Sequence, residues 1–262
     1  MSDRALHPLL LIVAALLVAF LLLPVAVVLL ASVSASAYLT VPPRGLTLHW
    51  FAEVLSNPDY LASIWFSVRL TACAVVLATL LALPACYALH HRWLPGSDAI
   101  AMLMMSPLVF PLVVVGVALL QYVSLLGLRG NFLILVLAHA VIVSPYIVRT
   151  VLAGLAAADP ALEDAARVLG ANRAGAFLLV VLPGIRAALA AGLVFAAITS
   201  FDEVTVTIFL LPPGHATLPV TIFTAIEQGV DPSVAAVSAL LIGATALVLV
   251  AAERIAGFER FL

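Results

Sequence analysis

Two adjacent acids, Asp202 and Glu203, are the most conspicuous candidates for chemistry in this chain of 262 residues. The sequence is 65% hydrophobic and only 9% charged, and the two acids interrupt an apolar stretch over residues 184–211. An ionised side chain at membrane depth is costly, so it normally faces a cavity, a partner or a pathway. We therefore expect at least one of these acids to face a cavity, with Ser200 and Thr205 adding polar atoms nearby; an acid so placed could contact a solute if that solute is cationic. Alternatively, both acids mark the external membrane boundary.

Other reactive side chains do not combine into a catalytic or metal site. His139 and Ser144 share one apolar segment, but their spacing places them roughly 140° apart around a helix, so they do not face each other as base and nucleophile. His139 is therefore interpreted as a packing or capping residue. Cys73 and Cys86 would lie about 20 Å apart along one helix, which is too far for a disulfide.

A standard nucleotide-binding P-loop is excluded by the composition of the basic residues. All 11 are arginine, and the phosphate-binding loop G-x-x-x-x-G-K-[ST] requires a lysine. We therefore expect no catalytic residue, cofactor site or metal site in this chain.

A long polar interruption over residues 159–183 has its own helix signals. Asp159 followed by Pro160 is typical of an N-cap with proline at the first helical position. Glu163 and Asp164 would then lie near the positive end of the helix, where carboxylates stabilise it by about 0.3–1 kcal/mol. The sequence predicts a short helix that begins here.

The same segment predicts an end to that helix and a second short one. Gly170 stands where a C-terminal glycine belongs, and a second helix is expected from near Asn172 to Pro183. Small and apolar residues recur at helical spacing on the first helix: Leu162, Ala165, Ala166 and Leu169. This stripe favours docking against another protein. Alternatively, the helix lies on the lipid surface, although a lipid-surface helix usually has a polar face rich in basic residues.

The positions of these residues follow from an all-α membrane architecture. Apolar runs of about 20 residues predict membrane helices, and six are found: 9–30, 63–89, 99–126, 132–152, 185–211 and 234–252. Prolines 24, 84, 107, 111 and 145 lie within them and are expected to kink their helices. Arg69 lies inside the second span. It either pairs with an acid such as Asp202 or Glu227, or extends its guanidinium to the external interface.

The orientation follows from the arginines, which are enriched on the cytoplasmic side of membrane proteins. With both termini in the cytoplasm, only Arg44 and Arg129 lie outside. On or beside the inner face lie Arg4, Arg92, Arg149, Arg167, Arg173, Arg186, Arg254 and Arg260. Residues 153–184 then form a cytoplasmic loop, and residues 31–62 and 212–233 form external loops.

The cytoplasmic segment resembles the EAA loop of binding-protein-dependent ABC transporter permeases. That pattern is E-A-A, three residues, G, nine residues, I, one residue, L-P. In register with it stand Asp164, Ala165, Ala166, Gly170, Val180, Leu182 and Pro183. Asp replaces Glu at the first position and Val replaces Ile. The runs at 67–89, 106–120 and 138–171, with SFDEVTVTIFL at 200–210 and LPVTIF at 218–223, are similar to the spermidine/putrescine branch.

The resemblance implies a MetI-like importer permease fold in a bacterial inner membrane. Residues 60–253 would form the permease core, preceded by a first helix and external loop over 1–59 and followed by a short tail over 254–262. The segment 159–183 would couple to a separate dimeric ATPase that binds ATP and Mg²⁺, through Asp159, Glu163, Asp164, Ala165, Ala166, Gly170, Leu182 and Pro183.

The resemblance also implies further partners: a second permease subunit, a distinct paralogue, and a periplasmic or lipid-anchored solute-binding protein. Glu227 and Asp231 would meet that protein or form a solvated loop face. The expected cargo is a polyamine, or else another small solute such as an amino acid derivative, an opine or an aminoalkylphosphonate. No nucleic-acid partner is implied. A stand-alone secondary transporter and an intramembrane enzyme are the alternatives from other classes.

Overall fold

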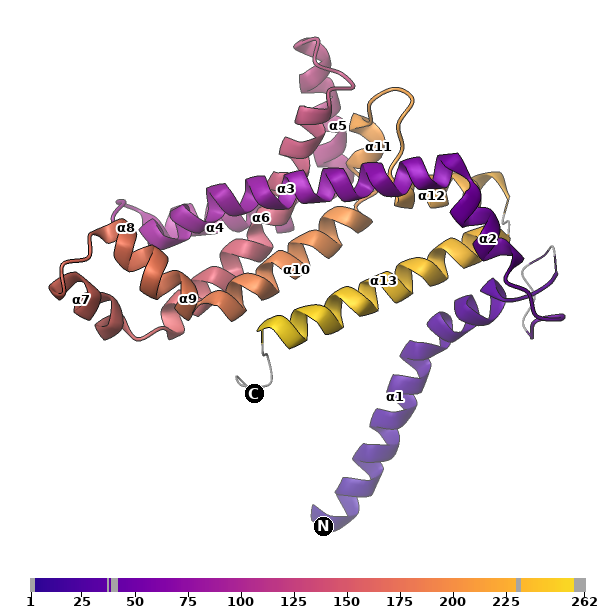
Figure 1. Cartoon of the computed structure of the whole chain (residues 1–262), viewed down its shortest axis with the longest axis horizontal. Coiled ribbons are helices and arrows are strands. Elements are labelled where there is room, and N and C mark those ends of the chain that lie inside the picture. The colour runs from indigo at the N-terminus through magenta and orange to yellow at the C-terminus, as the bar shows by residue number, and fades with distance from the viewer. Residues whose placement is uncertain (1–2, 37, 39–41, 230–231, 257–262) are drawn as a thin grey trace. The chain divides into compact units, whose positions relative to one another are not determined.

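The computed structural model describes residues 3–36, 38, 42–229 and 232–256, and these residues form helices almost throughout (Figure 1). The long helices are α1 (Asp3–Ser32), α3 (Pro58–His90), α6 (Phe132–Ala157), α10 (Arg186–Asp202) and α13 (Pro232–Ala256). Between them lie α2 (His49–Ser56), α4 (Ser97–Met105), α5 (Leu112–Leu125), α7 (Pro160–Val168), α8 (Arg173–Ala176), α9 (Leu182–Gly184), α11 (Thr207–Leu210) and α12 (Leu218–Gln228). Asp231 and the tail from residue 257 lie outside the described residues.

The chain divides into two compact units. The first comprises Met1–Leu61 and Thr221–Ala244, and the second comprises Ala62–Val220 and Thr245–Leu262. Helices α3, α12 and α13 each run from one unit into the other. The proposed boundary near residue 60 stays a prediction, because compactness alone does not define a functional domain.

The first unit is held by a few specific contacts after α1. The indole nitrogen of Trp50 donates a hydrogen bond to the Ser34 carbonyl at 2.9 Å, which ties α2 to the end of α1. The hydroxyls of Tyr60 and Ser233 lie 3.3 Å apart and join the start of α3 to the start of α13. Most of α1 is apolar and exposed, so it offers its surface to lipid or to another subunit.

Helix α6 is the centre of the second unit. Val143, Ile147, Val148 and Val151 have no exposed surface. Helix α10 packs along α6 at very short range, because a Cβ atom on Gly192 would lie 3.1 Å from the Ile147 Cα. The close approach thus requires glycine on α10.

Four helices are long and apolar enough to cross a membrane, in the segments Leu10–Ser32, Pro58–His90, Phe132–Ala157 and Pro232–Arg254. Two bent pairs, Ser97–Leu108 with Leu112–Leu125 and Arg173–Gly184 with Arg186–Asp202, pass the same test together. The described part of the chain therefore has between 4 and 6 candidate spans.

The third predicted span, over residues 99–126, was expected to be one kinked helix, and this prediction is wrong. The chain bends by 96° between α4 and α5, where Pro107 lies in a 3₁₀ turn and Pro111 has extended backbone angles before α5. Two prolines so close together remove two amide donors and break the helix. Pro84 and Pro145, by contrast, lie within continuous helices.

The fifth predicted span is wrong at its end. Helix α10 ends at Asp202 and not near residue 211, and α11 follows as a separate short helix. Helices α2 and α12 also replace parts of the segments expected to be external loops. The amide of Leu218, at the start of α12, donates a hydrogen bond of 2.8 Å to Ser67 Oγ on α3.

Candidate functional site

The start of α7 is fixed by its own sequence. Asp159 Oδ1 accepts a hydrogen bond of 2.9 Å from the Ala161 amide, and Pro160 occupies the first helical position. The carboxylate thereby satisfies one of the amides that a helix leaves free at its N-terminus. The predicted N-cap is confirmed.

The end of α7 is a Schellman turn at Gly170. The Gly170 amide donates to the Arg167 carbonyl, and the Ala171 amide donates to the Ala166 carbonyl, each at 3.0 Å. This pair of bonds requires a left-handed residue after the helix, and Gly170 has a φ of +96°. The predicted glycine stop is confirmed, and side chains other than glycine would be strained there.

The predicted second short helix is also confirmed. It begins at Asn172, whose Oδ1 accepts a hydrogen bond of 2.7 Å from the Gly175 amide. It continues through α8, a π-helical turn over Phe177–Val181, and α9. The chain then bends by 74° into α10 at Ile185. Leu182 and Pro183 lie in the last turn before this bend.

Most of the apolar surface of α7 is uncovered. Leu162, Val168 and Leu169 are 60%, 87% and 88% exposed. Ala165 is also exposed, and Ala166 is half-buried. An apolar side chain left this exposed at a helix end needs a covering surface, which can be protein or lipid.

The adjacent acids of α7 have different environments. Asp164 is exposed, whereas Glu163 contacts the end of α3. The Tyr87 hydroxyl donates a hydrogen bond to one Glu163 carboxylate oxygen. The other oxygen lies 3.2 Å from His91 Nε2. A cavity of about 250 Å³ lies beside this contact, between α3, α7 and α9.

Aromatic rings surround the Tyr87 contact. The Tyr87 ring centroid lies 4.6 Å from that of His91, 4.7 Å from Phe177 and 5.3 Å from Trp93. The Arg173 guanidinium lies over the Trp93 ring, 5.1 Å from its centroid. Both helices of the 159–183 segment are therefore packed against the end of α3 and the turn after it.

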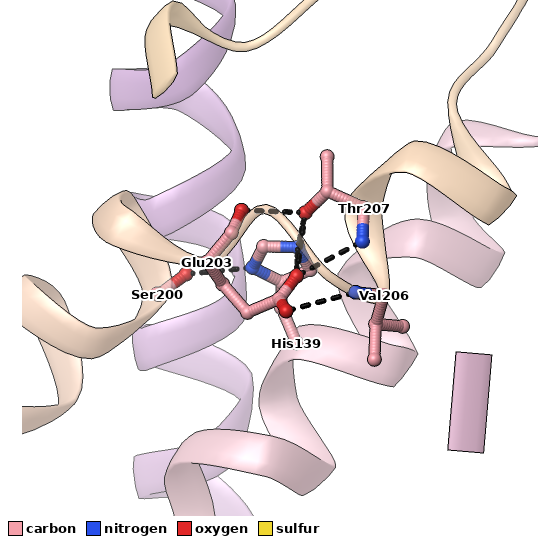
Figure 2. Close-up of polar contacts among 5 residues, drawn as sticks. All are labelled: His139, Ser200, Glu203, Val206 and Thr207. Carbon is pink, nitrogen blue, oxygen red and sulfur yellow. Dashed lines mark hydrogen bonds and ion pairs between the residues drawn. The ribbon is translucent and has the colours of Figure 1, made fainter. Parts of the chain in front are cut away.

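The second candidate site is a buried polar cluster where α10 ends (Figure 2). Glu203 is 6% exposed, and its carboxylate accepts hydrogen bonds from the Val206 amide at 2.8 Å and the Thr207 amide at 2.9 Å. The Thr207 hydroxyl lies 2.8 Å from both the carboxylate and the backbone oxygen of Glu203. Glu203 thus closes the turn between α10 and α11.

His139 joins this turn to the centre of α6. Its Nε2 lies 2.9 Å from Thr207 Oγ1, and its Nδ1 lies 3.0 Å from Ser200 Oγ, as Figure 2 shows. The Thr207 hydroxyl has one proton, which it donates to Glu203, so it accepts a hydrogen bond from His139 Nε2. Nδ1 of a neutral ring is then the acceptor for the Ser200 hydroxyl. Each group therefore donates a hydrogen bond to the next: Ser200 to His139, His139 to Thr207, and Thr207 to Glu203.

The predicted pathway residues do not form one group. Ser200 and Glu203 share the buried cluster, whereas Asp202 is exposed and Thr205 is half-buried. Arg69 lies with its guanidinium 4.4 Å from the centroid of the Phe132 ring, and the ion pairs found among the described residues do not include it.

His139 was missed as a functional candidate. A single histidine in an apolar run carries no signal for partners that are 61 and 68 residues away. Within the described residues, no group of three or more His, Cys, Asp or Glu side chains could hold a metal ion. Cys73 and Cys86 are both free.

Comparison with known sequences gives a family. Residues 74–258 match the family described as binding-protein-dependent transport system inner membrane component. The chain is 30% identical over 236 residues to the Escherichia coli K12 putrescine transport system permease protein PotI, with 87% of this chain and 84% of that protein covered. It is 26% identical to the spermidine/putrescine transport system permease protein PotC of the same organism, with 91% and 90% covered.

A further relative is the putative 2-aminoethylphosphonate transport system permease protein PhnV of Salmonella paratyphi A. It is 30% identical, and the match covers 92% of this chain and 91% of that protein. Among solved structures, a chain of a bacterial ABC transporter involved in alginate import has a TM-score of 0.78 at 17% identity, with 97% of each chain covered. This last likeness concerns the fold.

Proposed function

The chain belongs to the binding-protein-dependent transport system inner membrane component family, and on this premise we propose that it is the permease subunit of an ATP-driven polyamine importer. It would form half of the translocation pathway, with a second permease subunit, a distinct paralogue, forming the other half. A solute-binding protein outside the membrane would deliver the cargo. A pair of ATPase subunits would bind and hydrolyse ATP with Mg²⁺.

The proposal that an ATPase docks here rests on one observation: α7, which lies in the segment that matches the EAA pattern, is a capped helix with an exposed apolar surface. Leu162, Val168 and Leu169 are uncovered on a helix whose ends are both closed by its own side chains and backbone. A helix with both ends capped resists unwinding under load, so α7 is suited to transmit movement of a docked ATPase to the rest of the chain. The residues that we assign to coupling with the ATPase, by direct contact or by holding the segment in place, are Asp159, Glu163, Asp164, Ala165, Ala166, Gly170, Leu182 and Pro183.

The proposed topology has six spans in a bacterial inner membrane, with each bent pair counted as one span. Both termini would lie in the cytoplasm. The distribution of the arginines supports this orientation. It places α7 on the cytoplasmic side, where the ATPase would be.

The polyamine assignment is supported by the likeness to the putrescine and spermidine/putrescine relatives. The exposed carboxylate of Asp202 at the end of α10 is our candidate for a cargo contact, because an anionic group would replace the hydration of an ammonium group. The buried Ser200 and Glu203 would support the wall of the translocation pathway behind Asp202. Thr205 and Arg69 would lie further along this pathway.

A second cargo class, the aminoalkylphosphonates, is favoured by the likeness to the 2-aminoethylphosphonate relative at 30% identity. Such a cargo carries a phosphonate anion in addition to an ammonium group. Arg69 would then be the group that recognises the anion.

Reconstituted uptake tests both proposals. The complex would be purified through a tag on this chain, placed in liposomes with its binding protein, and supplied with putrescine, spermidine or 2-aminoethylphosphonate. We expect ATP-dependent uptake of the two polyamines. Uptake of the phosphonate alone would contradict the polyamine assignment, and a complex that contains no ATPase would contradict the importer.

A further inference from the structure

Glu163 and Asp164 are neighbours in the sequence, yet only one of them is available to a partner. The Glu163 side chain is 14% exposed, accepts a hydrogen bond from Tyr87 and lies 3.2 Å from His91 Nε2. Asp164 is exposed and stands in the EAA register. Successive residues of a helix are about 100° apart, so one acid can face inward while the next faces outward.

We propose that Glu163 is a positioning residue that passes movement of α7 to α3 through its contact with Tyr87, while Asp164 is left to contact the ATPase. This inference rests on the proposed docking of α7. It assigns separate roles to two acids that the sequence pattern places in one group.

The contact between Glu163 and Tyr87 is suited to this role because it is charge-assisted and held from several sides. Hydrogen bonds to an ionised carboxylate are about twice as strong as neutral ones. Tyr87 is buried, and the rings of His91, Trp93 and Phe177 surround its own ring. A ring packed this closely cannot change rotamer without moving its neighbours, so a displacement of Glu163 moves the end of α3.

Helix α3 can carry that displacement across the membrane. It is one continuous helix of 33 residues, Pro58–His90. Tyr87 lies at one end, and Ser67, which binds the amide of Leu218 at the start of α12, lies towards the other. Their separation of 20 positions corresponds to about 30 Å along a helix, the thickness of a bilayer core. One continuous helix thus joins α7 on the proposed inner side to α12 on the proposed outer side.

The test is to label α12 and drive the complex with ATP. A fluorophore on Glu227→Cys, in a Cys73→Ser background, would report movement of α12 in the purified complex with its ATPase. Glu227 is exposed and the remaining Cys86 is buried. We expect ATP to change the fluorescence of this otherwise unaltered complex. This readout does not depend on which solute is transported.

Tyr87→Phe keeps the aromatic ring and removes only the hydroxyl. The loss of one hydrogen bond to a charged group changes an equilibrium by about tenfold or more, and we expect the ATP-driven signal to fall by at least about tenfold while the ATPase still co-purifies. Glu163→Gln should have a smaller effect, because its amide oxygen still accepts from Tyr87. The double variant should be no worse than the more severe single variant, since both act through one contact.

Tyr122→Phe is the matched control, because it removes the same group from an exposed ring on α5 with no hydrogen bond among the described residues. A full signal in Tyr87→Phe, or effects that add in the double variant, would overturn the relay and leave the docking proposal intact. If Asp164→Asn and a bulky residue at Gly170 leave ATPase binding unchanged, the docking proposal itself fails.

Discussion

His139 and Thr207, 68 residues apart in sequence, are joined by a buried hydrogen bond of 2.9 Å between Nε2 and Oγ1. The bond fastens α6 to the start of α11. Because the Thr207 hydroxyl also bonds to Glu203, the turn after α10 is held by the side chains of α6 as well as by its own backbone.

Thr207→Val should destabilise the protein without a change of shape. The side chain keeps its volume, but His139 loses its acceptor and Glu203 loses a donor. An unsatisfied buried polar group costs about 1–3 kcal/mol, so the thermal unfolding midpoint in mild detergent should fall by several degrees. Thr205→Val is the control, since Thr205 is half-buried and makes no side-chain hydrogen bond among the described residues. Equal midpoints for the two variants would contradict the role of the cluster.

Gly192→Ala should loosen the packing of α10 on α6. The added Cβ would lie 3.1 Å from the Ile147 Cα, which is backbone and cannot rotate away. Overpacking of this kind costs about 1–3 kcal/mol, measured again by thermal unfolding. Gly243→Ala on α13 meets no atom within 4 Å and should be neutral. If both variants are equally stable, the close approach is not required.

The sequence predicted the helices and turns of the segment 159–183 well because its signals are local. Asp159, Pro160 and Gly170 act on atoms within five residues of themselves, through caps and a left-handed turn, so their types and spacing are sufficient. The buried cluster could not be predicted in this way. His139 meets Ser200 and Thr207 only once α6 and α10 are packed, and nothing near His139 in the sequence indicates those partners. The break between α4 and α5 is intermediate: Pro107 and Pro111 show that the helix is disturbed, but similar prolines at 84 and 145 lie in continuous helices.

Gly170→Leu should uncouple the transporter. A φ of +96° is unfavourable for any residue with a Cβ, and the strain of about 1–3 kcal/mol should open the turn that ends α7. We expect less ATPase to co-purify with this variant and putrescine uptake to fall, whereas Gly184→Ala, at a helical glycine with open space around it, should behave as the unaltered chain. Replacing Glu163 and Asp164 together with lysines should have the same effect as Gly170→Leu. Full uptake in these variants would refute a coupling role for the segment.

The two acids at the end of α10 should respond differently to neutralisation. Asp202→Asn alters an exposed carboxylate, so we expect normal stability, a normal complex and impaired putrescine uptake. Glu203→Gln places an amide where the carboxylate accepts hydrogen bonds from two backbone amides and a hydroxyl. The NH₂ group of the new side chain must then face at least one of these donors. This should cost about 1–3 kcal/mol of stability and reduce uptake only through loss of folded complex. Uptake per folded complex therefore separates the variants: it falls for Asp202→Asn and is retained for Glu203→Gln. The reverse result would place the cargo contact at Glu203 and require the buried cluster to open during transport.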